Sequence, residues 1–134
     1  MMPRWLRWAF CVPLGVLCSW LVVGLLEAVF DAAGLPRVHA FTLRAAASRF
    51  VGAFTFTWFP AMLSPKPWPV GIVMFAVDLL LAVGPLAWAL RFPYMRERML
   101  ATGWGTALGA IGLGALGGCL ALSLLWRRGR SAPV

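Results

Sequence analysis

The sequence predicts an all-α integral membrane protein, a bundle of four transmembrane helices joined by short loops. Two observations predict this fold class: the composition and the spacing of long apolar runs. Of 134 residues, 62% are hydrophobic and 12% are charged, whereas soluble domains are about 45–50% apolar and about 25% charged. A chain of this length has room for a single transmembrane domain over residues 1–134 and for no separate soluble domain.

The predicted helices correspond to four apolar runs, at about residues 8–30, 45–63, 69–90 and 100–126. A bilayer core about 30 Å thick requires about 20 helical residues. The first, third and fourth runs meet this length with few charged residues. The second run is shorter and contains Arg49. It is therefore either the fourth span or an interfacial helix, and in the second case three spans remain.

Short links separate these runs. Gly34 and Pro36 are expected to end the first helix, and Phe92-Pro93 the third, because glycine and proline interrupt helices. The segment Ser64–Pro69 contains three prolines, which remove hydrogen-bond donors and constrain the preceding residues. It is predicted to be non-helical. The segment Arg96-Glu97-Arg98 leads into the fourth run.

Tryptophan positions support the run boundaries independently. An indole ring favours the headgroup level of a bilayer, where its N–H stays hydrated and its ring stays dry. Seven of the eight tryptophans lie near the ends of predicted runs, and Trp20 lies in the middle of one. The predicted interfacial anchors are Trp5, Trp8, Trp58, Trp68, Trp88, Trp104 and Trp126.

The net charge of +8 is explained by basic residues at the ends of the apolar runs. This placement suits lipid headgroups and topology signals, so nucleic-acid binding is not expected. For four spans, the basic residues divide six against six between the two sides. Arginines directly before the first run and directly after the last one favour two cytoplasmic termini. Arginine far outnumbers lysine, which is typical of a GC-rich genome and predicts a bacterial inner-membrane protein. The first run lacks a small-x-small cleavage site, which indicates a retained span.

Three charged residues within the predicted helices form a candidate polar cluster. Asp78 lies near the middle of the third run, where an ionisable group requires a partner or water. At about 1.5 Å rise per residue, Arg49 lies within about 8 Å of Asp78 in depth. Glu27 reaches a similar depth from the other direction, so Glu27, Arg49 and Asp78 are predicted to join three helices. The alternatives are that Arg49 and Glu27 extend to the headgroups, and that Asp78 belongs to an ion relay.

Glycines form two predicted packing faces on the last helix. At about 100° per residue, Gly105, Gly109 and Gly112 share one face. The nearly opposite face contains Gly103, Ala107, Ala110, Gly114, Gly117 and Ala121. Small residues let helix backbones approach closely in a membrane, so two such faces predict a helix between two neighbours, one of them in another polypeptide. The alternative is that both faces pack within the chain, or that the glycines reflect composition.

The sequence contains no recognisable catalytic or metal-binding pattern. His39 is the single histidine, in the link before the second run, so two histidine ligands for a haem are absent. Cys11, Cys18 and Cys119 lie in apolar segments and resemble buried hydrophobic residues rather than a disulfide framework. No nucleophile-base set or phosphate-binding loop is present, so no catalytic activity, metal or cofactor is expected. Binding of a lipid or pigment is left open.

These features predict a non-catalytic accessory or structural subunit of a larger membrane protein complex, such as a respiratory, photosynthetic or transport assembly. Its expected partners are membrane lipids and other transmembrane subunits, with no small-molecule substrate. The alternative is a small homo-oligomeric transporter or ion channel that uses Asp78. A third hypothesis is a membrane enzyme whose site lies on the proline-rich or arginine-rich links.

Overall fold

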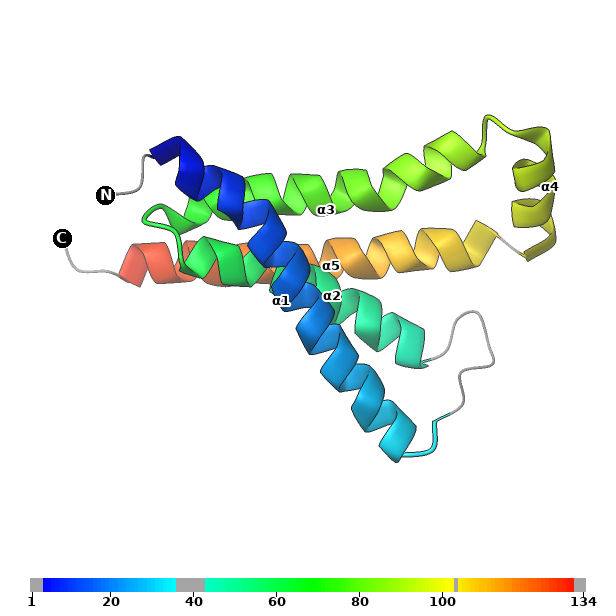
Figure 1. Ribbon diagram of the computed structural model, residues 1–134, viewed down its shortest axis with the longest axis horizontal. Helices are drawn as coiled ribbons and strands as arrows, with labels where there is room; N and C mark the ends of the chain where they lie inside the picture. Colours follow the sequence, from blue (N-terminus) through cyan, green and yellow to red (C-terminus); the bar gives the residue numbers. More distant parts are fainter. Residues whose placement is uncertain (1–3, 36–42, 103, 132–134) are drawn as a thin grey trace.

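The computed structural model describes residues 4–35, 43–102 and 104–131. The secondary structure of these residues is helices joined by turns, without β-strands, so the all-α prediction is confirmed. The five helices are α1 (Arg4–Ala32), α2 (Leu43–Met62), α3 (Pro67–Ala89), α4 (Pro93–Thr102) and α5 (Trp104–Ser131), shown in Figure 1.

Three helices are long and apolar enough to cross a membrane. The qualifying segments are Ala9–Ala32 in α1, Pro67–Ala89 in α3 and Gly105–Arg130 in α5. Helix α2 covers most of the second predicted run but is not among them, because its two arginines and its serine and threonines lower its hydropathy. Three membrane-crossing helices are therefore supported among the described residues, and the fourth span over 45–63 stays a prediction.

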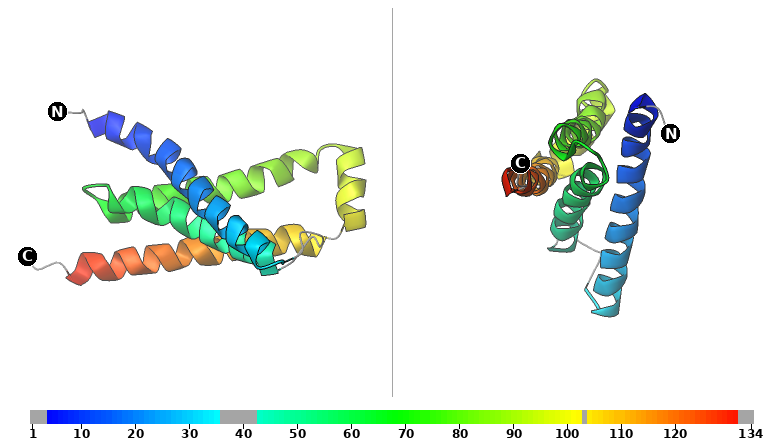
Figure 2. Two further views of the ribbon diagram at one scale, coloured as in Figure 1. Left: turned by 60° about the horizontal axis from the view of Figure 1, so that its bottom comes forward. Right: turned by 90° about the vertical axis from the view of Figure 1, so that its left-hand side faces the viewer.

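Helix α2 occupies the centre of the bundle and packs against α1, α3 and α5. In Figure 1, α3 and α5 run alongside each other while α1 crosses them obliquely. Figure 2 shows α1 on the outer side of α2, and its first half also touches α3, where Gly15 lies against Met74. The buried apolar cluster joins three helices and consists of Phe56 and Ala61 of α2, Val70 and Met74 of α3, and Leu125 of α5.

The two ends of the bundle differ. The beginning of α1, the link between α2 and α3, and the end of α5 lie together at one end (Figures 1 and 2). At the other end α4 runs across the gap between α3 and α5. The last predicted span, 100–126, needs correction, since α5 begins at Trp104 and continues to Ser131. The residues before it form α4, which opens on Pro93, a residue favoured at the first helical position.

Glycine and proline act at the links in two different ways. Gly34 adopts φ +71° and ends α1 in a Schellman motif, with Leu35 N bonded to Phe30 O at 3.0 Å and Gly34 N to Asp31 O at 3.1 Å. The prediction that Ser64–Pro69 is non-helical is wrong in its second half, because α3 begins at Pro67. The first turn of a helix has N–H groups without intrahelical partners, so prolines at its start remove no helical hydrogen bond.

Candidate functional site

Arg49 of α2 and Asp78 of α3 form an ion pair across the helix interface. Arg49 Nη2 lies 3.2 Å from Asp78 Oδ2, and Nη1 lies 3.4 Å from Oδ1. The Asp78 side chain is 9% exposed and that of Arg49 is 29% exposed. Since Asp78 is the middle residue of α3, the pair lies far from both ends of that helix. The structure therefore brings together two of the three residues of the predicted polar cluster.

The third residue, Glu27, belongs to a different cluster between α1 and α2. Arg44, which is buried, donates to Glu27 and also bonds to Asp31 at 2.7 Å. Ser48 Oγ donates to Glu27 Oε1 at 2.6 Å. The prediction of one cluster joining Glu27, Arg49 and Asp78 is thus corrected to two separate pairings.

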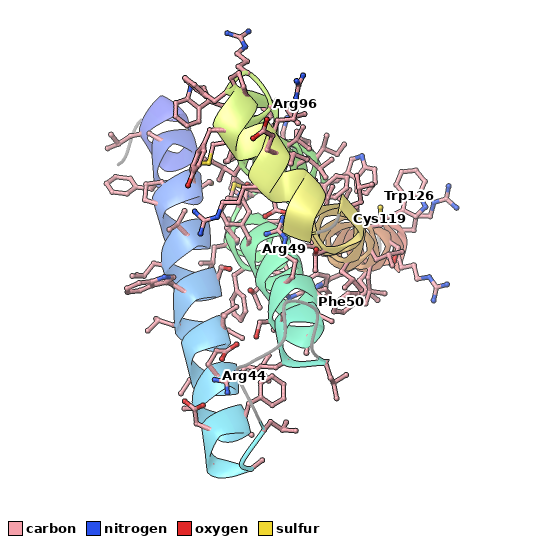
Figure 3. All side chains as sticks on the ribbon, turned by 90° about the vertical axis from the view of Figure 1, so that its right-hand side faces the viewer. Arg44, Arg49, Phe50, Arg96, Cys119 and Trp126 are labelled. Atoms are coloured by element: carbon pink, nitrogen blue, oxygen red, sulfur yellow. The ribbon has the colours of Figure 1, made fainter. Side chains whose placement is uncertain are left out.

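The pairing of Glu27 with Arg44 has a simple structural reason. Glu27 and Asp31 are four residues apart and share one face of α1, and Arg44 stands in the first turn of α2, directly opposite them. In Figure 3, Arg44 lies between α1 and α2, whereas Arg49 lies farther along α2, behind α4. The depth estimate from the sequence did not include the oblique crossing of α1. The sequence does carry a signal for this cluster: Glu27 and Asp31, one helical turn apart, stand just before the link, and Arg44 stands just after it. The sequence prediction did not use this signal.

Gly114 of α5 makes room for the arginine of the ion pair. A Cβ atom at position 114 would lie 2.8 Å from Arg49 Nε and 2.9 Å from Nη2. One turn further along α5, Gly117 lies against the backbone carbonyl of Phe50, and Gly118 lies against the ring of Phe75. Gly114, Gly117 and Gly118 are buried. This small-residue face of α5 therefore packs inside the chain, against α2 and α3. Gly118 was not in the predicted set.

The opposite small-residue face of α5 is left uncovered by the described residues. Gly105 and Gly112 are exposed, and a Cβ atom on either would meet no atom within 4 Å. Leu116 (61% exposed) and Cys119 continue this face. Figure 3 shows Cys119 on the outer side of α5. We call Gly105, Gly112, Leu116 and Cys119 the outward face of α5. Gly109 is half-buried at its edge, and Gly103 lies outside the described residues.

A crevice with a volume of about 330 Å³ lies between α3 and α5. Arg49 contributes its one charged side chain. Its other walls are apolar: Ala82, Pro85 and Leu86 of α3, and Ala107, Ala110 and Ile111 of α5. The predicted face containing Ala107, Ala110, Gly114, Gly117 and Ala121 is thus divided between this crevice and the buried interface.

Several tryptophans lie near the ends of the helices. Trp68 and Trp126 are in contact, with ring centroids 5.1 Å apart, and Arg130 lies over the Trp126 ring at 4.4 Å. Trp88 is 60% exposed near the end of α3, while Trp58 stacks on Phe54 and packs against the core. The side chains of Trp5, Trp8 and Trp104 lie outside the described part of the chain.

Metal-binding geometry is absent from the described ranges, where no group of three His, Cys, Asp or Glu residues converges. His39 lies outside those ranges. Cys11 and Cys18 are half-buried on α1, and no disulfide joins any of the three cysteines. The candidate sites among the described residues are therefore the Arg49–Asp78 pair with its crevice, and the cluster of Glu27, Asp31 and Arg44.

Comparisons with protein families, with curated proteins and with solved structures find no match to this chain.

Proposed function

We propose that this chain is a non-catalytic accessory subunit of a larger membrane protein complex, embedded in the bacterial cytoplasmic membrane with both termini on the cytoplasmic side. The outward face of α5 is the observation that carries the proposal. Lipid tails supply no hydrophobic drive for helix association, so close backbone packing must supply it. The buried small face of α5 already serves this purpose within the chain, and Gly105 and Gly112 offer the same surface to a second helix.

The remaining surface supports the same proposal. Helix α1 leaves Trp20, Leu21, Leu25 and Val29 more than half exposed, as suits a helix that contacts lipid. The basic residues at the end of α5, Arg127, Arg128 and Arg130, lie at the same end of the bundle as the beginning of α1. Cytoplasmic placement of this end agrees with the positive-inside preference. The described links between helices are short, which leaves little room for a soluble active site.

The test is co-purification of tagged protein from native membranes in mild detergent, followed by mass spectrometry. The variant Gly112→Leu places a large side chain on the outward face, where no atom of the described residues lies within 4 Å of the Cβ position. Overpacking of about 1–3 kcal/mol would weaken partner binding roughly fivefold to 150-fold. The matched control is Gly24→Leu on α1, because Gly24 is also exposed and also has no atom near its Cβ position.

We expect Gly112→Leu to lose the co-purifying subunit while its melting temperature stays the same, and Gly24→Leu to retain the subunit. Equal recovery of partners with both variants would refute the role of the outward face. Oxidative cross-linking through Cys119 in membranes separates the two kinds of partner: a disulfide-linked dimer of this chain would identify a second copy rather than a different subunit.

A small homo-oligomeric transporter or ion channel is the second candidate. Its specific support is the position of Asp78 in the middle of α3, because charged groups inside membrane spans often serve ion pathways. Ion flux into proteoliposomes that is lost with Asp78→Asn and kept with Glu97→Gln would favour it. Glu97 is an exposed carboxylate on α4 and serves as the control. Absence of flux with the unmodified protein would remove this candidate.

A further inference from the structure

The ion pair leaves part of the Arg49 guanidinium without a partner. A guanidinium has five N–H donors, and Arg49 makes two hydrogen bonds among the described residues, both to Asp78. Its side chain is 29% exposed and forms part of the crevice wall. In a bilayer core, a polar group without a partner is unfavourable because no water is there to satisfy it. The crevice therefore presents hydrogen-bond donors that lack acceptors.

The shape of the crevice follows from the course of α3. Pro85 stands inside α3 and lines the crevice, and proline in a helix interior bends the helix away from its regular path. In Figure 1 the last part of α3 leans away from α5 toward α4. On the α5 side the crevice is lined by Ala107 and Ala110, whose small side chains leave the space open. The resulting space of about 330 Å³ is at the lower end of the range for small-molecule sites, about 300–1,000 Å³.

Charge balance decides which kind of ligand suits this crevice. Arg49 and Asp78 together are neutral, so an anion bound to Arg49 would leave an uncompensated negative charge among apolar walls. An uncharged hydrogen-bond acceptor adds no net charge and still satisfies the free N–H groups. The depth of the pair narrows the choice further. Arg49 lies at the deep end of the crevice, because its partner Asp78 is eleven residues from each end of α3, whereas Leu86 and Ala107 each lie three residues from a helix end. A ligand that reaches the Arg49 donors must therefore carry its acceptor oxygen below the headgroup level at which phospholipid carbonyls and phosphates lie.

We propose that the crevice between α3 and α5 binds a membrane quinone, with a ring carbonyl accepting a hydrogen bond from Arg49 and the apolar ring lying against Ala82 and Ala110. A quinone is uncharged, flat and lipid-soluble, and it carries its carbonyl groups into the bilayer core. This site is separate from the outward face of α5, so the subunit proposal and the quinone proposal are tested independently.

The experiment uses the full chain in phosphatidylcholine nanodiscs and a photoreactive benzoquinone with a ten-carbon tail. We expect saturable labelling of α3 and α5 near the crevice, displaced by unlabelled decyl-benzoquinone. Decylbenzene has the same tail and no carbonyl, so it should compete roughly tenfold to a hundredfold less well, the range for one hydrogen bond to a charged group. Equal competition by decylbenzene would show that the crevice accepts hydrocarbon without using the Arg49 donors. Labelling that does not saturate would show non-specific insertion of the probe, and either result would overturn the proposal.

Two matched pairs of variants locate the site. Ala82→Leu fills the crevice, while Ala87→Leu makes the same change at an exposed position of α3 that does not line it. We expect at least tenfold weaker labelling with Ala82→Leu and unchanged labelling with Ala87→Leu. Arg49→Lys keeps the positive charge beside Asp78 but loses the planar set of donors, so it should reduce the preference for the quinone over decylbenzene. Unchanged labelling of Ala82→Leu, with its melting temperature maintained, would place the quinone elsewhere. The competition arms need no variant and remain decisive if Ala82→Leu does not fold.

Discussion

Removal of Arg49 tests whether the ion pair at the centre of the bundle is structural. The substitution Arg49→Met keeps an apolar chain of similar reach. It leaves the buried Asp78, whose side chain is 9% exposed, without its cationic partner. Breaking a buried pair from one side costs about 3–5 kcal/mol, whereas replacing both partners with apolar residues is often neutral or stabilising. We therefore expect Arg49→Met to be strongly destabilised and Arg49→Met/Asp78→Leu to recover most of the loss.

The assay is equilibrium unfolding of the purified protein in mixed micelles, with all four proteins of the double-mutant cycle measured side by side. Arg96→Met is the control, because Arg96 is exposed on α4 and its loss should change the free energy of unfolding by about 0.5 kcal/mol or less. The reasoning fails if Arg49→Met costs no more than Arg96→Met. It also fails if the double variant loses the sum of the two single losses, since the two side chains would then act independently.

Three further predictions concern other contacts. Gly117→Leu places a side chain against the Phe50 carbonyl and should lower stability by about 1–3 kcal/mol, while Gly105→Leu on the outward face should leave the thermal unfolding of the purified chain unchanged. Gly34→Ala introduces a Cβ at φ +71° and should cost about 1–2 kcal/mol in the same unfolding measurement, with Gly24→Ala neutral or stabilising. Arg44→Met removes the partner of Glu27 and Asp31, so the link between α1 and α2 should be cleaved faster by added protease than in Arg96→Met, and equal cleavage would contradict this role.

The three helices that are long and apolar enough to cross a membrane were predictable, because a helix that faces lipid must be apolar along most of its surface. Regular spacing also separated the two glycine faces of α5, one buried at Gly114 and Gly117 and the other open at Gly105 and Gly112. The approach of Arg49 to Asp78 followed from counting residues from the link that joins α2 to α3. That link is short and fully described, so little freedom was left in the relative depth of the two helices.

The features that escaped prediction depend on how helices cross. Glu27 pairs with Arg44 because α1 lies obliquely over α2. The crossing angle between two helices cannot be obtained by counting residues along the chain. The crevice at Pro85 exists because α3 and α5 diverge toward α4, which is a property of the pair rather than of either sequence segment. Helix α4 was missed for a different reason: its segment is polar and opens with proline, and proline at the first position of a helix was taken as an end rather than a beginning.

Helix α2 is the least suited of the four long helices to lipid and yet the most enclosed by protein. Gly52, Thr55 and Thr57 are buried along it, and Ser19 of α1 donates to the Gly52 carbonyl at 3.1 Å. An arginine near the centre of an isolated span costs about 2.5–3.5 kcal/mol to insert, and in the folded chain Asp78 of α3 offsets this for Arg49. If α2 spans the membrane, its insertion must therefore depend on its neighbours.

We expect α2 placed alone in an insertion assay, with glycosylation sites reporting on each side, to remain largely uninserted. The same segment followed by α3 should insert, because Asp78 is then available to Arg49. Asp78→Leu in that longer segment should reduce insertion of α2, while Asp78→Glu should preserve it. Efficient insertion of α2 alone would show that its own apolar residues suffice. The polar side chains along it would then require another explanation.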